Sequence, residues 1–202
     1  MERKGPIMAL RSYMRKEELS ALIVPSNDPH FGEYIPDHYK CREWLSNFTG
    51  SAGTLVVTLD KAALWTDSRY FVQAENELSG SGIELMKMKV EGTPSISQWI
   101  LSNLEEDGIV AIDENLFTYQ EYCSWVDELS PLNVTMIEDP FDEIWNERPV
   151  LEFHPIEPLD VSISRESTTS KHKVLVEQIA LPYPFVYIIS ARDEIAWLCN
   201  IR

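Results

Sequence analysis

The stretch with the clearest capacity for chemistry is Asp67-Ser68-Arg69-Tyr70. An aspartate and an arginine two residues apart at a strand end can hold the planar guanidinium toward a cleft, where it would bind a carboxylate or carbonyl at two points. The same residues allow a structural interpretation, in which Asp67 or Ser68 caps the following helix and Arg69 forms a surface ion pair that contributes little. The residues alone favour the structural interpretation.

The cysteines and histidines show no spacing that is typical of a metal or disulfide site. The three cysteines are far apart and odd in number, a pattern typical of buried thiols in a reducing compartment. None of the four histidines belongs to an H-E-x-x-H motif or is paired locally with a cysteine. The spacing of these residues therefore indicates no metal site. The residues concerned are Cys41, Cys123, Cys199, His30, His38, His154 and His172.

Two further patterns are better explained by structure than by chemistry. Thr49-Gly50-Ser51-Ala52-Gly53-Thr54 is rich in small residues but has no lysine after it. A tight turn beside a strand is therefore favoured over a phosphate-binding loop. The acidic runs Glu105-Glu106-Asp107 and Asp139…Asp142-Glu143 are interpreted as solvated faces. Asp113-Glu114 follows a predicted strand, but by itself it indicates no site.

Apolar runs and helical periodicity predict the elements that position these residues. A hairpin with strands at Leu55–Thr58 and Ala62–Thr66 is followed by a helix whose buried face is Tyr70/Phe71, Ala74 and Leu78. A helix at Ile7–Met14 precedes a fully apolar strand at Ala21–Val24, and a second such strand is Ile109–Ile112. Because a hairpin interrupts alternating strands and helices, we predict an α/β fold, a three-layer mixed sheet with helices on both faces.

The remaining elements follow from the same patterns. Thr118 and Glu121 form a capping box, and Thr93-Pro94 marks another helix start. The expected buried stripes are Ile96, Trp99, Ile100 and Leu104 in one helix, and Tyr119, Tyr122, Cys123, Val126 and Leu129 in the other. Further strands are expected at Ile83–Met88, Val134–Ile137 and Phe185–Ile189, a helical turn at Phe141–Trp145, and a helix around Val174–Ile179.

Composition limits the classes of function. The chain has 202 residues, 44% of them hydrophobic, which suits one domain or one and a fraction. The net charge of −16 would repel a phosphate backbone, so we expect no nucleic-acid partner. No apolar run is long enough for a membrane span, and residues 1–16 lack the pattern of a signal peptide. We therefore expect a cytoplasmic protein without a membrane partner.

An internal repeat predicts the domain organisation. Leu22–Asp28 resembles Tyr187–Asp193, and Glu43-Trp44-Leu45-Ser46-Asn47-Phe48 resembles Ala196-Trp197-Leu198-Cys199-Asn200-Ile201. Prolines at 149, 155 and 158 indicate an extended connector. We predict a first domain at 1–148, a linker at 149–161 and the truncated start of a second, similar domain at 162–202.

Several long motifs together resemble the N-terminal region of cytosolic-type Xaa-Pro aminopeptidases (aminopeptidase P). They are Leu22–His30 with Glu33-Tyr34-Ile35, Phe48–Thr54, Trp65-Thr66-Asp67-Ser68-Arg69-Tyr70-Phe71, Met86-Lys87-Met88, Asp142–Pro149 and Asp193–Arg202. The resemblance implies a creatinase-type, ribonuclease H-like N-terminal fold. It also implies hydrolysis of the bond between an N-terminal residue and a following proline, with two metal ions, usually manganese, in a third domain.

The resemblance also sets expectations for the sites and partners of this chain. The metal ligands and catalytic histidines of the family belong to the third domain, so this chain alone is expected to be inactive, without a cofactor of its own. Arg69 is the one site residue carried over, because the family's arginine in this stretch is associated with the peptide substrate. The implied partners are a peptide with proline at its second position and the parent protein's own C-terminal domains. Oligomeric state does not follow from the sequence, and a homo-oligomer stays open.

A second hypothesis treats the chain as an interaction module without activity. The same fold occurs in the large subunit of a histone chaperone, and the acidic composition would suit a basic protein partner. The unbroken Trp65–Phe71 run and the Asp142–Pro149 motif favour the peptidase hypothesis.

Overall fold

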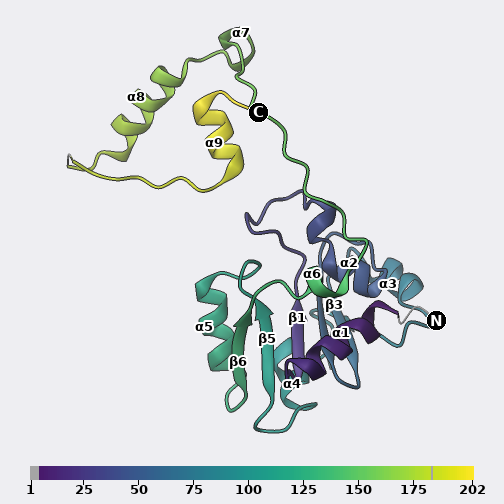
Figure 1. Ribbon diagram of the computed structural model, residues 1–202. Helices are drawn as coiled ribbons and strands as arrows, with labels where there is room; N and C mark the ends of the chain where they lie inside the picture. Colours follow the sequence, from purple (N-terminus) through teal and green to yellow (C-terminus); the bar gives the residue numbers. More distant parts are fainter. Residues whose placement is uncertain (1–4, 183) are drawn as a thin grey trace. The chain divides into compact units, whose positions relative to one another are not determined.

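The computed structural model describes residues 5–182 and 184–202. These residues form two compact units, which divide between Leu151 and Glu152 (Figure 1). The first unit holds a six-stranded sheet, and the second contains the helices α7, α8 and α9. Within the described residues, no helix combines the length and apolar character that crossing a membrane would require.

The sheet of the first unit is mixed. Its strand order is β4-β3-β2-β1-β5-β6. β1 pairs antiparallel with β2 and parallel with β5, β2 and β3 form the antiparallel hairpin, and the pairs β3–β4 and β5–β6 are parallel. The predicted mixed sheet is confirmed. The strands are β1 (Ala21–Val24), β2 (Thr54–Thr58), β3 (Ala62–Thr66), β4 (Glu84–Lys87), β5 (Ile109–Asp113) and β6 (Asn133–Ile137).

Helices cover both faces of this sheet, which gives the predicted three layers (Figure 1). The central strands β1 and β3 are buried along their whole length, as their unbroken apolar sequences predict. Alternate side chains of each strand enter different cores, for example Leu22 in one and Ile23 in the other. The helices are α1 (Pro6–Lys16), η1 (Asp37–Tyr39), α2 (Cys41–Ser46), α3 (Phe71–Glu77), α4 (Ile96–Leu101), α5 (Tyr119–Glu128) and α6 (Phe141–Ile144).

The starts of three helices test the capping predictions. The capping box of Thr118 and Glu121 is confirmed at the start of α5. The predicted start of α4 at Thr93-Pro94 is wrong, because Ser95 caps the helix and forms a capping box with Gln98. The predicted cap of α3 is wrong as well, because the helix begins only at Phe71 and no side chain caps it.

The buried faces agree with the periodicity except in α5. Ala74 and Leu78 of the α3 region are buried as predicted. In α5 the predicted face included Tyr119 and Val126, but their exposed fractions are 77% and 40%. Trp125 packs against the core instead, beside Tyr122 and Leu129. Helical spacing is compatible with burial of either face. In the structure, the face that contains Trp125 packs against the sheet, and the face that contains Tyr119 and Val126 is exposed.

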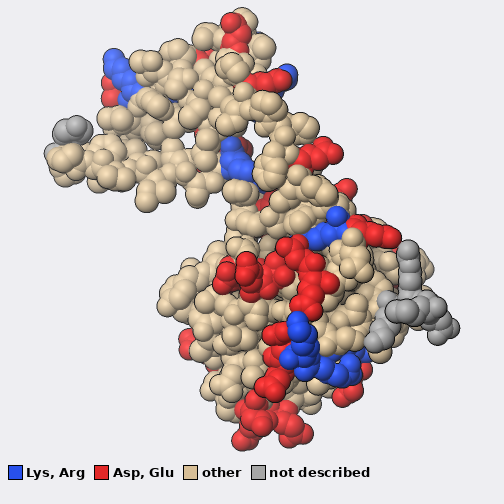
Figure 2. Space-filling model, viewed as in Figure 1, with Lys and Arg blue, Asp and Glu red and all other residues tan. Residues whose placement is uncertain are grey.

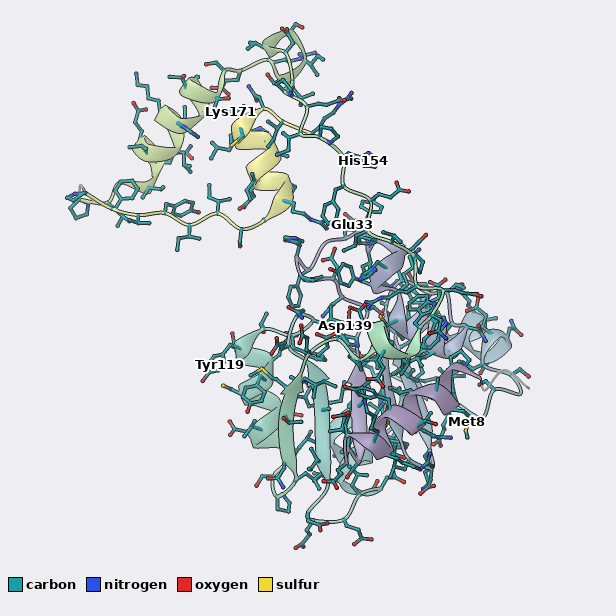
Figure 3. The ribbon with its side chains drawn as sticks, viewed as in Figure 1. Met8, Glu33, Tyr119, Asp139, His154 and Lys171 are labelled. Atoms are coloured by element: carbon teal, nitrogen blue, oxygen red, sulfur yellow. The ribbon has the colours of Figure 1, made fainter. Side chains whose placement is uncertain are left out.

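The second unit is held together largely by its own hydrogen bonds. Residues 157–159 pair with residues 200–202, with the bridge joining Pro158 and Ile201. The buried ammonium of Lys171 donates to the Trp197 carbonyl at 2.7 Å and to Asn200 Oδ1 at 2.6 Å, so it caps the end of α9 (Figure 3). Its helices are α7 (Val161–Ser164), α8 (Thr168–Ile179) and α9 (Arg192–Cys199).

The predicted strand at Phe185–Ile189 is wrong. These residues carry no strand hydrogen bonding, and Val186 and Ile188 are 87% and 85% exposed. A strand needs a neighbour to accept and donate its ladder hydrogen bonds, and none of the described residues supplies one here. The apolar sequence is therefore left without strand pairing.

Candidate functional site

The loops at one edge of the sheet gather most of the polar residues that the sequence singled out. Because β2 alone runs antiparallel to the other strands, its amino end lies beside the carboxyl ends of β1, β3 and β5. This carboxyl edge therefore brings together the segment after β1, the small-residue loop before β2 and the Asp67–Arg69 turn after β3. In α/β proteins, such an edge is where ligands commonly bind.

Arg42, a buried residue of α2, fixes the small-residue loop. Its guanidinium donates to the carbonyls of Phe48 at 2.8 Å and Gly50 at 2.5 Å. Its Nε donates to Ser26 Oγ at 2.7 Å, and that hydroxyl in turn donates to the Gly53 carbonyl at 2.7 Å. Burial lowers the pKa of Arg42 to about 10, so the side chain stays charged near neutral pH. The loop is thus held by a buried cation that binds its carbonyl groups.

The glycines of this loop serve close packing, whereas the sequence predicted that they allow a tight turn. A Cβ at Gly50 would lie 2.3 Å from the Phe48 ring and 2.8 Å from the Tyr70 ring. A Cβ at Gly53 would lie 3.0 Å from the Trp65 carbonyl oxygen. The Thr66 hydroxyl adds a further bond, to the Ala52 carbonyl at 2.7 Å. The loop is therefore a rigid wall of the edge.

Arg69 lies on the surface beside this wall. Its Nε and Nη2 donate to the two carboxylate oxygens of Asp67 at 2.9 and 2.7 Å, and its side chain is 67% exposed. Hydrogen bonds from the side chain and backbone of Arg69 lower the pKa of Asp67 to about 2. Tyr70 connects the turn to the loop through a 2.6 Å hydrogen bond between its hydroxyl and Ser51 Oγ. Arg69 thus forms the predicted surface pair, and its contact with substrate stays a prediction.

A second charged cluster lies where β6 ends and α6 begins (Figure 3). Arg148 Nη1 donates to Asp139 at 2.6 Å and to Asp142 at 2.7 Å, and its Nε donates to the His38 carbonyl at 2.9 Å. The Arg148 side chain is only 6% exposed. The interpretation of the Asp139 run as a solvated face is therefore wrong for Asp139, whose side chain is 18% exposed, while that of Asp142 is 74% exposed.

The same cluster contains the ligand types of a metal site. Side-chain atoms of His38, Asp139 and Asp142 lie within 4.8 Å of one another. However, the guanidinium of Arg148 already bonds both carboxylates, and His38 Nδ1 lies 2.8 Å from the Pro149 carbonyl. A cation here would have to displace Arg148 from its partners. These residues therefore fit an arginine-centred ion-pair cluster and do not fit a resident metal ion.

Asp113, at the end of β5, is buried near this cluster. Its residue is 4% exposed, and its Oδ1 accepts a hydrogen bond from the Asn115 backbone at 2.9 Å. Burial, together with the charge of Asp139, raises the pKa of Asp113 to about 6, against the opposing effects of the Asn115 hydrogen bonds and, more weakly, of Arg148. The sequence placed Asp113 at a strand end without assigning it a role, and the structure shows a carboxyl group that titrates above its ordinary range.

Two grooves open at the carboxyl edge. The first, of about 520 Å³, lies among the segment after β1, the small-residue loop and α5. The second, of about 480 Å³, lies between the end of β3, the segment after β4 and the start of α4. Trp125 and Glu128 of α5 line both grooves. Arg69 lines neither, and sequence reasoning named neither Arg42 nor Glu128.

A family model for the creatinase/prolidase N-terminal domain matches residues 6–144. The chain belongs to this family. Its fold agrees with that of solved members, such as the N-terminal domain of the cytoplasmic peptidase PepQ from Mycobacterium tuberculosis, with a TM-score of 0.52 at 17% identity over 69% of this chain and 97% of that one.

The more specific similarity is to Xaa-Pro aminopeptidases. Xaa-Pro aminopeptidase 1 of Dictyostelium discoideum is 37% identical over 96% of this chain and 32% of its own length. Aminopeptidase P2 of Arabidopsis thaliana is 40% identical over 91% of this chain and 26% of its own length. The chain therefore spans about a third or less of these relatives.

The similarity to solved structures extends over nearly the whole chain. The X-prolyl aminopeptidase of Caenorhabditis elegans is described as a cytosolic enzyme with a di-nuclear active site. The TM-score is 0.85 at 30% identity, over 98% of this chain and 34% of the other. The predicted resemblance to this class of enzyme is thus confirmed by sequence and by structure.

Proposed function

We propose that this chain is the non-catalytic N-terminal part of a metal-dependent Xaa-Pro aminopeptidase, which removes the N-terminal residue that precedes proline. The observation that best supports this proposal is the match to the Caenorhabditis elegans structure over 98% of the chain. In the parent enzyme, this part shapes the access of a peptide with proline at its second position. It also supports assembly with the C-terminal domains. The assembled enzyme can include more than one copy of the chain, as a homo-oligomer. We place the enzyme in the cytoplasm, as described for that relative.

The proposed cofactor is a pair of divalent metal ions, with manganese as the expected metal, held by residues outside this chain. The di-nuclear active site of the Caenorhabditis elegans enzyme supports this part of the proposal. Within the described residues, the acidic and histidine cluster around Arg148 does not fit such a centre. No catalytic step is therefore assigned to this chain.

The first test measures hydrolysis by the 202-residue chain alone. With added manganese and an unblocked Xaa-Pro peptide, we expect no release of the N-terminal residue above the rate without protein. The complete protein encoded by the parent reading frame is the positive control, and the metal ligands of a catalytic domain should be readable there. Release by the chain alone, at a rate proportional to its concentration, would contradict the non-catalytic assignment.

A second test concerns Arg69 in the complete enzyme. If its guanidinium leaves Asp67 to bind the substrate, Arg69→Ala should raise KM or lower kcat/KM by about ten-fold while the fold stays intact. Arg69→Lys should recover part of the loss, because it keeps the charge but not the planar fork. The matched control is Arg15→Ala on the exposed side of α1. Unchanged kinetics of the Arg69→Ala enzyme would show that Arg69 has only a structural role.

The acidic composition supports one alternative, an inactive interaction module that binds a basic protein. The viewed face of the first unit, which carries α1 and α6, shows acidic side chains gathered in patches (Figure 2). The two hypotheses differ in what the parent protein contains, because only the enzyme needs intact metal ligands outside this chain. A parent sequence without those ligands would favour the module.

A further inference from the structure

The two grooves of the carboxyl edge share one wall, because a single helix turn lines both. Trp125 and Glu128 lie three residues apart on α5, so their side chains share one face of the helix. Glu121 and Ser124, one turn earlier, continue that face along the first groove. The result is a stripe of acidic and aromatic side chains beside a hollow in the surface.

The charges of this stripe lack a cationic partner among the described residues. The residues lining the first groove include Glu121 and Glu128 but no lysine or arginine. Glu121 is engaged in the capping box of α5, whereas the exposed carboxylate of Glu128 has no ion pair or hydrogen bond to any other described residue. Lys89 is the one basic residue among those lining the second groove. The first groove therefore favours a positively charged group near Glu128.

The opposite walls are fixed before any ligand arrives. Arg42, Ser26 and Thr66 each donate a hydrogen bond to a carbonyl of the small-residue loop that lines the first groove. In the second groove, the Trp65 indole Nε1 donates to the Pro94 carbonyl at 2.9 Å. Preformed walls reduce the entropy cost of ordering the site on binding.

The second groove supplies an apolar surface next to the charged one. Met88 is 43% exposed, and Ile96 and Trp125 are partly buried there. Flat aromatic and thioether surfaces accept prolyl and bulky aliphatic side chains in extended peptides. A ligand that spans both grooves thus needs a cationic side chain and, close to it in sequence, an apolar one.

We propose that this pair of grooves binds an extended peptide segment, with a lysine or arginine side chain at Glu128 and a neighbouring apolar residue against Trp125 and Met88. The site is built entirely from the first unit, and it does not depend on the proposed peptidase function. The stated charge complementarity distinguishes this occupant from an acidic peptide, which Glu121 and Glu128 would repel.

Binding is tested with the N-acetylated, C-amidated peptide Ala-Lys-Pro-Leu-Ala and the whole 202-residue chain. The acetyl group blocks the N-terminal amine, so binding is observed without aminopeptidase cleavage. We expect the peptide to shift the Trp125 indole N–H signal in a ¹⁵N–¹H NMR spectrum, assigned with Trp125→Phe. Replacing the peptide lysine by glutamate should abolish the shift, and replacing its leucine by alanine should weaken binding.

Two matched variants make the test specific. Glu128→Gln should raise Kd about five-fold, since an exposed ion pair contributes up to about 1 kcal/mol. Glu106→Gln removes the same charge in the loop before β5, at the opposite edge of the sheet, and should leave Kd unchanged. Thermal unfolding of both variants checks that they are folded. Equal effects of the two variants, equal binding of the lysine and glutamate peptides, shifts confined to other residues, or no binding would each overturn the proposal.

Discussion

Burial brings the pKa of the Asp113 carboxyl close to neutral pH. Its folded pKa of about 6 lies above the ordinary value of 3.8. Between these pH values the folded chain keeps a proton that the unfolded chain releases. Folding stability therefore falls as the pH rises through this window, and the full cost is present above about pH 6, at most about 3 kcal/mol.

We predict that Asp113→Asn stabilises the first unit near neutral pH. The amide removes the buried charge and keeps an oxygen that can accept from the Asn115 backbone. The free energy of unfolding should rise by about 2 kcal/mol above pH 6, and the gain should vanish below pH 3.8. Urea unfolding across this pH range measures it. The control is Asp107→Asn, at an exposed position. A gain in stability that is equal at all pH values would show that the buried charge of Asp113 is not its cause.

At the scale of elements, the sheet edge is organised by side chains that bind loop carbonyls. Arg42, Ser26 and Thr66 hold the small-residue loop, and Glu77 of α3 accepts bonds from the backbone and hydroxyl of Thr49. Such bonds replace the ladder that a strand would provide. The loop can therefore stay rigid without regular secondary structure.

Arg42→Met is predicted to destabilise the first unit by about 3 kcal/mol. The methionine fills part of the space but leaves the Phe48 and Gly50 carbonyls without their buried donor. Arg42→Lys should cost less, because one ammonium can serve some of the acceptors. Urea unfolding followed by circular dichroism measures both, with the surface change Arg15→Met as control. An Arg42→Met variant as stable as the control would show that the loop holds its shape without the arginine.

Most elements of the first unit could be predicted because their burial is periodic or continuous along the chain. Ala21–Val24 and Ala62–Thr66 are apolar at nearly every position, which is typical of a short strand covered on both faces. Helix starts were less predictable. Asp67 had a helix-capping sequence context, but its carboxylate binds Arg69 instead. Local sequence cannot show whether an aspartate accepts hydrogen bonds from the backbone at a helix start or from a nearby arginine side chain.

The charged parts of the candidate site were hidden for a related reason. Arg42 is an arginine in a short helix, and an arginine there usually lies on the surface. Its burial depends on the small-residue loop, whose carbonyls it binds six and eight residues later. The burial of Asp139 is equally hard to predict, because its partner Arg148 follows nine residues later, after α6. Patterns of hydropathy contain no signal for such pairs.

At the scale of the whole molecule, one helix in each unit ends with the same local structure. These helices are α2 in the first unit and α9 in the second. The predicted sequence echo aligns Asn47 after α2 with Asn200 after α9. Both asparagines adopt the left-handed conformation, with φ of 59° and 51°. Leu45 and Leu198, two residues earlier, are both buried. This agreement supports the predicted start of a second, similar domain, and the boundaries 1–148, 149–161 and 162–202 stay a prediction.

The second unit should depend on Lys171. We predict that Lys171→Met speeds hydrogen exchange in α8 and α9, because the Trp197 carbonyl and Asn200 lose their buried donor at a cost of about 2 kcal/mol. Exchange in the sheet of the first unit should not change. Lys173→Met, at a side chain that is 76% exposed, is the control. Equal protection of α9 in both variants would show that the cap is dispensable.

The arginine-centred cluster has a consequence for how this fold responds to its surroundings. Arg148 is a cation that the chain itself encodes, and it bonds Asp139 and Asp142 as soon as the chain has folded. Neutralisation of these carboxylates therefore requires no supply of ions, and a chelator has nothing to remove from them. This cluster can therefore form in the same way whether or not metal ions are present during folding.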